Sequence, residues 1–217
     1  LTVIGETAFA DCVALEKIVL PDSMLKIDDL VFSGCTGLKQ VVFPNGIKKI
    51  GKAAFKNCTS LTQVDLPASL IYISTDVFRG CESLRTIRID PKNKHYKSEP
   101  NKRDGNDHVL FNKNKSVLIS FPSRQHTTSY TIPDSVTKIS SWAFCDCHNL
   151  EQIIIPDSVT EIGEGAFYQC SSLRSVVIPD SVDKIDDTAF RGCVNLEAVT
   201  IPESVTEFGW GIFNGCD

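Results

Sequence analysis

The chain has 217 residues, enough for one large domain or two small ones with a substantial buried core. Apolar residues make up 42% and charged residues 23%, as in ordinary soluble globular proteins. The formal net charge of −5 argues against non-specific binding to nucleic acid, which needs a basic face. No apolar run approaches the roughly 18 residues of a membrane span, so direct membrane insertion is not expected.

Cysteine recurs in two runs with a constant step of 23 residues. A phenylalanine lies three residues before each of these cysteines, and a leucine lies three residues after each of the first seven. An apolar-x-apolar-Pro cluster follows each leucine in most repeats. This period predicts a solenoid, in which each coil buries its apolar side against its neighbours. The column cysteines are Cys12, Cys35, Cys58, Cys81, Cys147, Cys170, Cys193 and Cys216.

The repeat that begins at Leu150 shows the expected structure of one coil. Residues 150–156 (LEQIIIP) alternate inward and outward side chains, which predicts a short strand that Pro156 ends. Val159 and Ile162 predict a second short extended piece. Residues 164–170 (EGAFYQC) have the spacing of about one helical turn, with Phe167 and Cys170 on its buried face.

The combined pattern, Leu-x-x-[Ile/Val]-x-[Ile/Leu]-Pro followed by Ala-Phe-x-x-Cys, resembles the BspA-like class of leucine-rich repeats of bacterial and some protist surface proteins. The resemblance is close over residues 1–90 and 130–217. It implies an α/β fold by the leucine-rich-repeat convention, rich in β-structure: a right-handed curved solenoid with a parallel concave sheet and short helical turns. It also implies a cell-surface or secreted location, a role in adhesion or protein binding, and no cofactor.

Residues 91–129 break the register, because Phe78 and Phe144 are 66 residues apart. The segment contains two strand-like pieces, VLF and SVLISF, joined by the turn-forming NKNK. It resembles the irregular stretch N-x-x-Y-x-S…V-L-F…L-I-x-[YF]-P of the family. We predict that irregular coils with one protruding hairpin continue a single solenoid over residues 1–217; a linker between two domains is the less favoured alternative. The matching residues are Asn93, Tyr96, Ser98, Leu110, Phe111, Leu118, Ile119, Phe121 and Pro122.

Both ends of the sequence fall inside a repeat. Leu1 aligns with Val159, in the middle of a coil, and Asp217 follows a column cysteine. Solenoids need polar caps on their end coils, and no cap is recognisable. We therefore expect the chain to be a fragment of a longer protein, monomeric as a fragment.

The column cysteines admit four interpretations. A catalytic thiol needs a lowered pKa and a nearby base, which eight equivalent apolar positions do not all provide. A zinc site needs converging ligands, whereas these lie one per coil. Coils about 5 Å apart are within bridging range, but identical side chains in a ladder point the same way, which disfavours disulfides. We predict that these cysteines are small buried hydrophobes.

Cys145 lies outside the column and is expected to be a solvent-exposed thiol. The other repeats hold Ala10, Ser33, Lys56, Arg79, Tyr168, Arg191 and Asn214 at this position. The segment CDCH (145–148) offers too few ligands for a metal site. Residues 99–108, which include RDGNDH, lack the spacing of a calcium loop and are expected to form a polar loop. No nucleophile elbow, phosphate loop or His-Glu metal motif occurs, so neither a metal nor an enzymatic activity is predicted.

The outward-pointing residues of the longer strands form the candidate ligand-binding face, expected on the concave side. Exposed apolar positions on an extended solenoid face suggest protein binding, although β-branched residues are favoured in any strand. The candidate residues are Lys17, Val19, Gln40, Val42, Gln63, Asp65, Thr86, Arg88, Gln152, Ile154, Val177 and Thr200.

The leading hypothesis is a non-enzymatic recognition module that binds a protein ligand, such as a host extracellular or surface protein. The alternative is a structural spacer within a larger protein. An enzyme with a site in residues 99–108 is a distant third.

Overall fold

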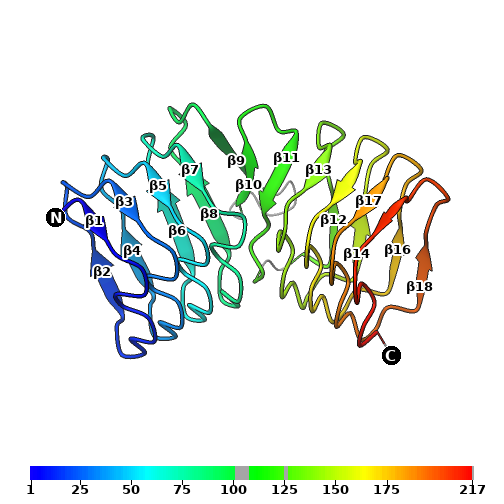
Figure 1. Cartoon of the computed structure of the whole chain (residues 1–217), viewed down its shortest axis with the longest axis horizontal. Helices are drawn as coiled ribbons and strands as arrows, with labels where there is room; N and C mark the ends of the chain where they lie inside the picture. Colours follow the sequence, from blue (N-terminus) through cyan, green and yellow to red (C-terminus); the bar gives the residue numbers. More distant parts are fainter. Residues whose placement is uncertain (101–107, 125–126, 217) are drawn as a thin grey trace. The chain divides into compact units, whose positions relative to one another are not determined.

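The computed structural model describes residues 1–100, 108–124 and 127–216, which form two compact units, Leu1–Lys113 and Asn114–Asp217 (Figure 1). The loop of residues 99–108, apart from its ends, and His126 lie outside the described residues. Each unit is a β-solenoid made of stacked coils. The single array predicted over residues 1–217 stays a prediction.

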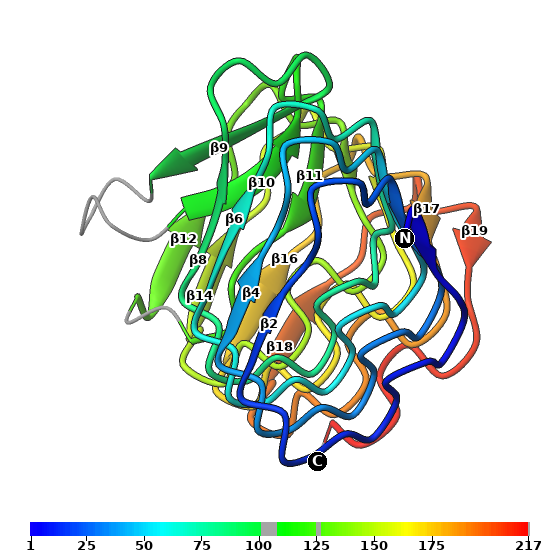
Figure 2. The ribbon, with the colours of Figure 1, turned by 90° about the vertical axis from the view of Figure 1, so that its left-hand side faces the viewer.

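The first unit contains two kinds of strand in each regular coil. The short strands β1 (Val3–Ile4), β3 (Lys26–Ile27), β5 (Lys49–Ile50) and β7 (Tyr72–Ile73) form one parallel sheet. The longer strands form two parallel pairs, β2 (Lys17–Val19) with β4 (Gln40–Val42), and β6 (Gln63–Leu66) with β8 (Thr86–Ile89). The two kinds lie on different sides of the coils, as β1 and β2 show in Figure 2.

The second unit repeats this arrangement. Strands β11 (Val117–Ser120), β13 (Lys138–Ile139), β15 (Glu161–Ile162), β17 (Lys184–Ile185) and β19 (Glu207–Phe208) are successive parallel neighbours in one sheet. Strands β12 (Ser129–Thr131), β14 (Gln152–Ile154), β16 (Ser175–Val177) and β18 (Ala198–Thr200) form the other. From β13 onward, register partners such as Glu161 and Lys184 are 23 residues apart. One sequence repeat is therefore one coil.

A column of stacked phenylalanine rings fills the core of each unit. The interplanar angles between neighbouring rings are between 5° and 28°. Phe121, from the irregular segment, takes the column position next to Phe144, with a centroid separation of 4.8 Å. The predicted phenylalanine column is thus confirmed. The centroid separations are 5.4, 5.2 and 6.1 Å for Phe9–Phe32–Phe55–Phe78, and 5.0, 4.9 and 5.6 Å for Phe144–Phe167–Phe190–Phe213.

The predicted short helical turns are wrong, because no residue among those described is helical. Around Phe32, the N–H groups of Leu30, Phe32 and Gly34 donate to carbonyl oxygens of the next coil, at 2.9, 2.8 and 2.8 Å. An α-helix would direct them to carbonyls four residues earlier in the same segment. Leu30 and Gly34 also have φ values of 58° and 75°, which interrupt a right-handed helix. The segment is a run of tight turns that bonds to its neighbour.

Consistent with this, no helix in residues 1–100, 108–124 and 127–216 has the length and hydropathy needed to cross a bilayer.

The irregular segment begins with a buried asparagine. The Asn93 side chain is 1% exposed, and its amide nitrogen lies 3.2, 3.1 and 2.8 Å from the carbonyl oxygens of Pro67, Ala68 and Leu70. Its oxygen accepts the N–H groups of His95 and Tyr96, both at 2.8 Å. One side chain therefore fixes the turn after β6 to the start of the irregular segment.

Tyr96 and Ser98 then bond to backbone groups of the preceding coil. The Tyr96 hydroxyl accepts the Ile73 N–H at 3.1 Å and donates to the Ile71 carbonyl at 3.2 Å. Ser98 Oγ accepts the Ile89 N–H at 3.0 Å. These hydroxyls satisfy groups at β7 and β8 that a further regular coil would otherwise bond.

The two strands predicted in the irregular segment are present as β10 (His108–Asn112) and β11. Within the first unit, β10 pairs in antiparallel fashion with β9 (Tyr96–Pro100), a strand that the sequence analysis did not identify.

Replacing a column phenylalanine should destabilise the second unit strongly. Phe167 is fully buried between two rings, so Phe167→Ala should lower the free energy of unfolding by about 3–5 kcal/mol. Phe208→Ala, at a side chain that is 52% exposed, is the matched control and should cost under about 1 kcal/mol. Urea denaturation measures both. Equal losses would contradict the assignment of the column as the core.

Asn93→Leu should destabilise the first unit by at least about 3 kcal/mol, because it leaves buried carbonyl and N–H groups without partners. Lys94→Leu, at the exposed next position, is the control and should have little effect. Thermal and urea unfolding of the two variants test the difference. A loss below about 1 kcal/mol for Asn93→Leu would show that water replaces the amide at no cost.

Candidate recognition surface

The candidate face of the first unit is formed by the outward side chains of β2, β4, β6 and β8. Val19 and Val42 are 62% and 38% exposed, and they lie in register on neighbouring strands. Arg88 is half-buried opposite Asp65. The predicted residues Lys17, Gln40, Gln63 and Asp65 are all exposed.

Thr86 is the exception. It keeps the outward register opposite Gln63 but is only 6% exposed, because the start of β10 covers it. The His108 N–H donates to Thr86 Oγ1 at 3.2 Å. Thr86 is therefore a structural contact and not part of an exposed surface, which corrects the sequence-based assignment. Strand alternation gives the face on which a residue lies, but not what later segments cover.

Asp65 is the centre of a small polar group on this face. It accepts a hydrogen bond from Gln63 Nε2 at 3.1 Å, and Arg88 Nη1 lies 3.9 Å from Asp65 Oδ1. Both partners of this ion pair are substantially exposed, so it contributes under about 1 kcal/mol to stability.

A hollow of about 370 Å³ lies beside this group, where three parallel strands of the first unit end. Its lining includes Phe43, Asn45 and Asp90, which the sequence analysis did not select. They follow the carboxyl ends of β4 and β8, and that position is the signal that could have identified them. The hollow gives the first unit a concave feature within the size range of ligand sites.

The outward positions of β12, β14, β16 and β18 in the second unit hold no charged side chain. Ile154 and Val177 are 51% and 66% exposed, and the predicted residues Gln152 and Thr200 are exposed beside them. The remaining outward positions of strands β12 to β18 hold Ser129, Thr131, Ser175 and Ala198, all exposed. Exposed apolar side chains with uncharged polar neighbours, fixed in a regular array, have the composition of a protein-contact surface.

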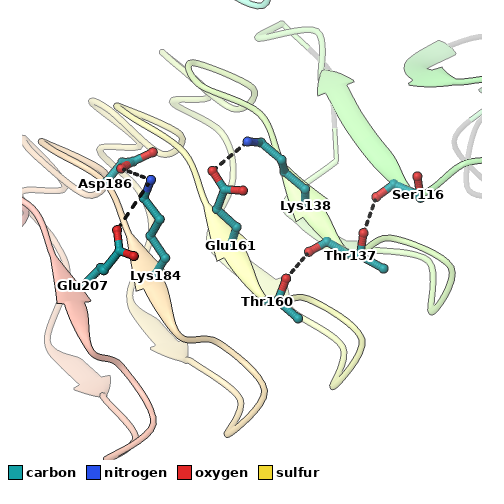
Figure 3. A network of polar contacts seen from close by, with 8 residues as sticks. All are labelled: Ser116, Thr137, Lys138, Thr160, Glu161, Lys184, Asp186 and Glu207. Atoms are coloured by element: carbon teal, nitrogen blue, oxygen red, sulfur yellow. Dashed lines mark hydrogen bonds and ion pairs between the residues drawn. The ribbon is translucent and has the colours of Figure 1, made fainter.

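The other sheet of the second unit carries a ladder of alternating charges (Figure 3). Lys138 lies in register with Glu161, their charged atoms 2.6 Å apart. Lys184 contacts Asp186 at 3.2 Å and Glu207 at 3.7 Å. The hydrogen bond and charge of Asp186 raise the pKa of Lys184. Both lysines of this ladder thus have carboxylate partners, and the three carboxylates outnumber the two lysines.

Six of the eight column cysteines donate a thiol hydrogen bond to a phenylalanine carbonyl, and five of these six are buried. Each Sγ lies near the carbonyl oxygen of the phenylalanine 26 residues earlier, in the preceding coil. That oxygen already accepts an N–H within its own coil, as Phe9 O accepts from Cys12 at 3.2 Å. The Sγ–O distances are 3.0, 3.1, 3.1, 3.1, 3.2 and 3.2 Å for Cys35, Cys58, Cys81, Cys170, Cys193 and Cys216.

Burial lowers the reactivity of these thiols. It raises the pKa of Cys35 to about 11 and that of Cys170 well above its usual value. A hydrogen bond with Cys170, together with burial, raises the pKa of Cys193. Within the described residues, which include all nine cysteines, none forms a disulfide. The predicted packing role is confirmed for the six buried column cysteines and is wrong for Cys12, which is exposed. The donor role was missed because a repeat pattern does not show hydrogen bonds.

Cys145 was expected to be exposed, and this expectation is wrong. The side chain is 7% exposed, and its thiol lies 3.0 Å from Asp146 Oδ2. The equivalent residues of other coils, such as Ser33, Lys56 and Tyr168, are half-buried, so this position is less exposed than its mostly polar residues suggest. In the described part of the chain, no group of three or more His, Cys, Asp or Glu side chains could hold a metal ion.

Residues 2–101 and 119–217 match the BspA type leucine rich repeat region, in six copies. Because the match extends over most of the chain, the protein belongs to this family of leucine-rich repeat proteins. The family and the fold are those of repeat proteins that are generally not enzymes. No curated protein matches the sequence.

Three solved structures of bacterial proteins are similar to the chain. A leucine-rich repeat protein from Eubacterium ventriosum is 26% identical with a TM-score of 0.82, over 99% of this chain and 61% of its own. The pneumococcal vaccine antigen PcpA is 27% identical with a TM-score of 0.72, over 88% of this chain and 52% of its own. A leucine rich cell surface protein from Faecalibacterium prausnitzii is 28% identical with a TM-score of 0.76, over 100% and 67%. The chain thus spans between about half and two thirds of these proteins.

Thiol reactivity should follow burial along the chain. A maleimide reagent at pH 8 should modify Cys12 first and Cys216 more slowly, because these are exposed and half-buried. The other seven cysteines, Cys145 among them, should react only when urea unfolds the chain. Mass spectrometry of peptides after timed labelling measures this order. Modification of Cys145 as fast as Cys12 in the native protein would contradict its burial.

Proposed function

We propose that the protein is a non-enzymatic protein-binding or adhesion module of a cell-surface or secreted protein, acting as a monomer. The observation that supports this most is the uncharged outward face of β12, β14, β16 and β18, where Ile154 and Val177 stay exposed. Parallel strands hold these side chains in fixed register, so binding requires little ordering. Protein ligands at a host surface are the partners we propose.

The surface location rests on the relatives. One similar structure is a leucine rich cell surface protein and another is a vaccine antigen. Both share the fold of this chain over most of its length. The exposed face of the first unit, with Val19, Val42 and the hollow beside Asp65, offers a separate contact surface.

A structural spacer is the second candidate. The observation that favours it is the coil-to-coil bonding itself, in which each regular coil contacts its immediate neighbours. A spacer would bind no partner through its outward faces and would tolerate the addition or removal of whole coils.

Introducing charge on the uncharged face should abolish binding. Fluorescently labelled chain would be applied to a panel of immobilised extracellular matrix and plasma proteins. For any protein that is bound, Ile154→Lys/Val177→Lys should reduce the affinity at least tenfold, because two desolvated charges would enter an apolar contact. Val13→Lys/Val194→Lys adds the same charge at exposed turn positions outside both sheets and should leave the affinity unchanged.

The control outcomes separate the candidates. Absence of binding to every protein of the panel, together with unchanged cell adherence after deletion of one whole coil, would favour the spacer. Equal losses for the two double variants would show a general charge effect and contradict the assignment of this face. Circular dichroism and unfolding curves establish that both variants fold.

A further inference from the structure

The short-strand sheet of the first unit has a surface that differs from its counterpart in the second unit. Two adjacent columns of side chains cross strands β3, β5 and β7 there. Lys26, Lys49 and Tyr72 are register partners on these strands. The residues just before them, Leu25, Lys48 and Ile71, are stacked by backbone hydrogen bonds of 2.8 and 2.9 Å. We call these six residues the basic-apolar patch.

In the same two columns of the second unit, most polar side chains bond to groups of neighbouring coils. One column contains threonines, and the hydroxyls of Thr137 and Thr160 donate to backbone carbonyls of the preceding coil (Figure 3). The other column is the alternating ladder of Lys138, Glu161 and Lys184, in which each charge faces an opposite one. The repeat therefore accommodates polar residues and paired charges at these positions, so the fold does not require the basic-apolar patch.

The charges of the patch are not balanced. Lys26 and Lys49 are directly opposite one another, an arrangement of like charges that destabilises a sheet. Lys26 pairs with Asp28, whereas Lys49 lies over the Tyr72 ring, 5.2 Å from its centroid. Among residues 1–100, 108–124 and 127–216, no carboxylate forms an ion pair with Lys48 or Lys49. Two exposed ammonium groups thus remain available to an external anion.

Apolar side chains border these lysines on both sides. Leu25, Ile71 and Tyr72 are 47%, 51% and 49% exposed. In the second unit the column of Leu25 and Ile71 holds threonine or aspartate instead. Exposed aliphatic and aromatic groups next to unpaired cations fit a ligand that supplies both carboxylates and apolar side chains.

We propose that the basic-apolar patch binds a short acidic segment of a partner protein, with carboxylates on Lys48 and Lys49 and an apolar side chain among Leu25, Ile71 and Tyr72. Three coils about 4.8 Å apart span about 10 Å, the length of three extended residues. The ligand is therefore a short linear motif. This surface is on the short-strand sheet of the first unit, whereas the outward face proposed above is on the longer strands of the second unit. The patch therefore gives the protein a second, chemically different partner.

A polyanion or an anionic membrane is a poorer fit. Such ligands are bound by large basic areas, whereas this chain is acidic overall, with a net charge of −5, and the patch is half apolar. The apolar residues would add nothing to phosphate or sulfate binding. Substitution of these apolar residues should therefore weaken the binding of an acidic peptide but not that of a polyanion.

The probe is a fluorescein-labelled seven-residue peptide in which glutamate alternates with leucine or tryptophan, measured by fluorescence anisotropy. The full chain should bind it, more weakly at higher salt. Peptides with glutamine in place of glutamate, or serine in place of the apolar residues, should bind at least tenfold more weakly. Lys48→Glu/Lys49→Glu should reduce the affinity at least tenfold, and so should Ile71→Ser/Tyr72→Ser, which keeps both lysines.

Two control variants localise the effect. Lys39→Glu/Lys56→Glu makes the same change of net charge in the first unit outside the patch and should bind normally. Ile154→Lys/Val177→Lys should also bind normally, which separates this proposal from the outward face. The proposal is overturned by the absence of binding, by equal binding of the glutamine peptide, or by equal losses in the patch and control variants. It is also overturned if dextran sulfate or phosphatidylserine vesicles bind equally well and Ile71→Ser/Tyr72→Ser has no effect on the peptide.

Discussion

The hydrogen bonds between neighbouring coils are the constraint on which the rest of the structure depends. At the buried turn of most regular coils, the backbone bonds to the next coil through the N–H groups at and on either side of the column phenylalanine, as around Phe32. The phenylalanine carbonyl then accepts the thiol of a column cysteine such as Cys58, at 3.1 Å. These contacts require equivalent residues of neighbouring coils to lie side by side. The length of the coil and the identity of its inward residues are therefore fixed together. The outward residues are free to vary, and all candidate binding functions lie there.

Much of this could be predicted from the sequence because the repeat reports inward contacts directly. The step of 23 residues gives the register of both sheets, and the phenylalanine and cysteine columns give the core. The helical turn was wrong because Ala-Phe-x-x-Cys has helical spacing, whereas the left-handed φ values at positions such as Leu30 leave no sign in residue type. Thr86 and Cys145 were misplaced because each is buried by a contact that the repeat pattern does not show. Thr86 bonds to the start of β10, and Cys145 bonds to Asp146. The donor role of the thiols and the lining of the hollow depend on contacts between residues of different coils, which the order of residues does not show.

The two units use one backbone to present different chemistry. In the second unit, the outward face is uncharged while the opposite sheet pairs its charges internally (Figure 3). In the first unit, charged residues such as Asp65 and Arg88 occupy the outward face, and the opposite sheet exposes lysines without counterions. Since inward residues are nearly the same in every coil, this difference has little cost in stability. Specificity in such a protein is therefore a property of columns rather than of single residues, because a ligand contacts equivalent positions of several coils at once.

The side chains of Asn93, Tyr96 and Ser98 bond to the edge of the last regular coil, and this has a consequence for how such genes change length. These three residues bond to backbone groups of the coil that precedes them, such as the Leu70 carbonyl and the Ile73 N–H, and those groups are common to every regular coil. Unequal recombination that removes or duplicates a whole coil upstream would leave an equivalent backbone edge, to which these three side chains could bond. The irregular segment thus decouples repeat number from whatever follows it. The columns of outward residues can therefore be lengthened or shortened without a change in the residues that bond the irregular segment to the last regular coil.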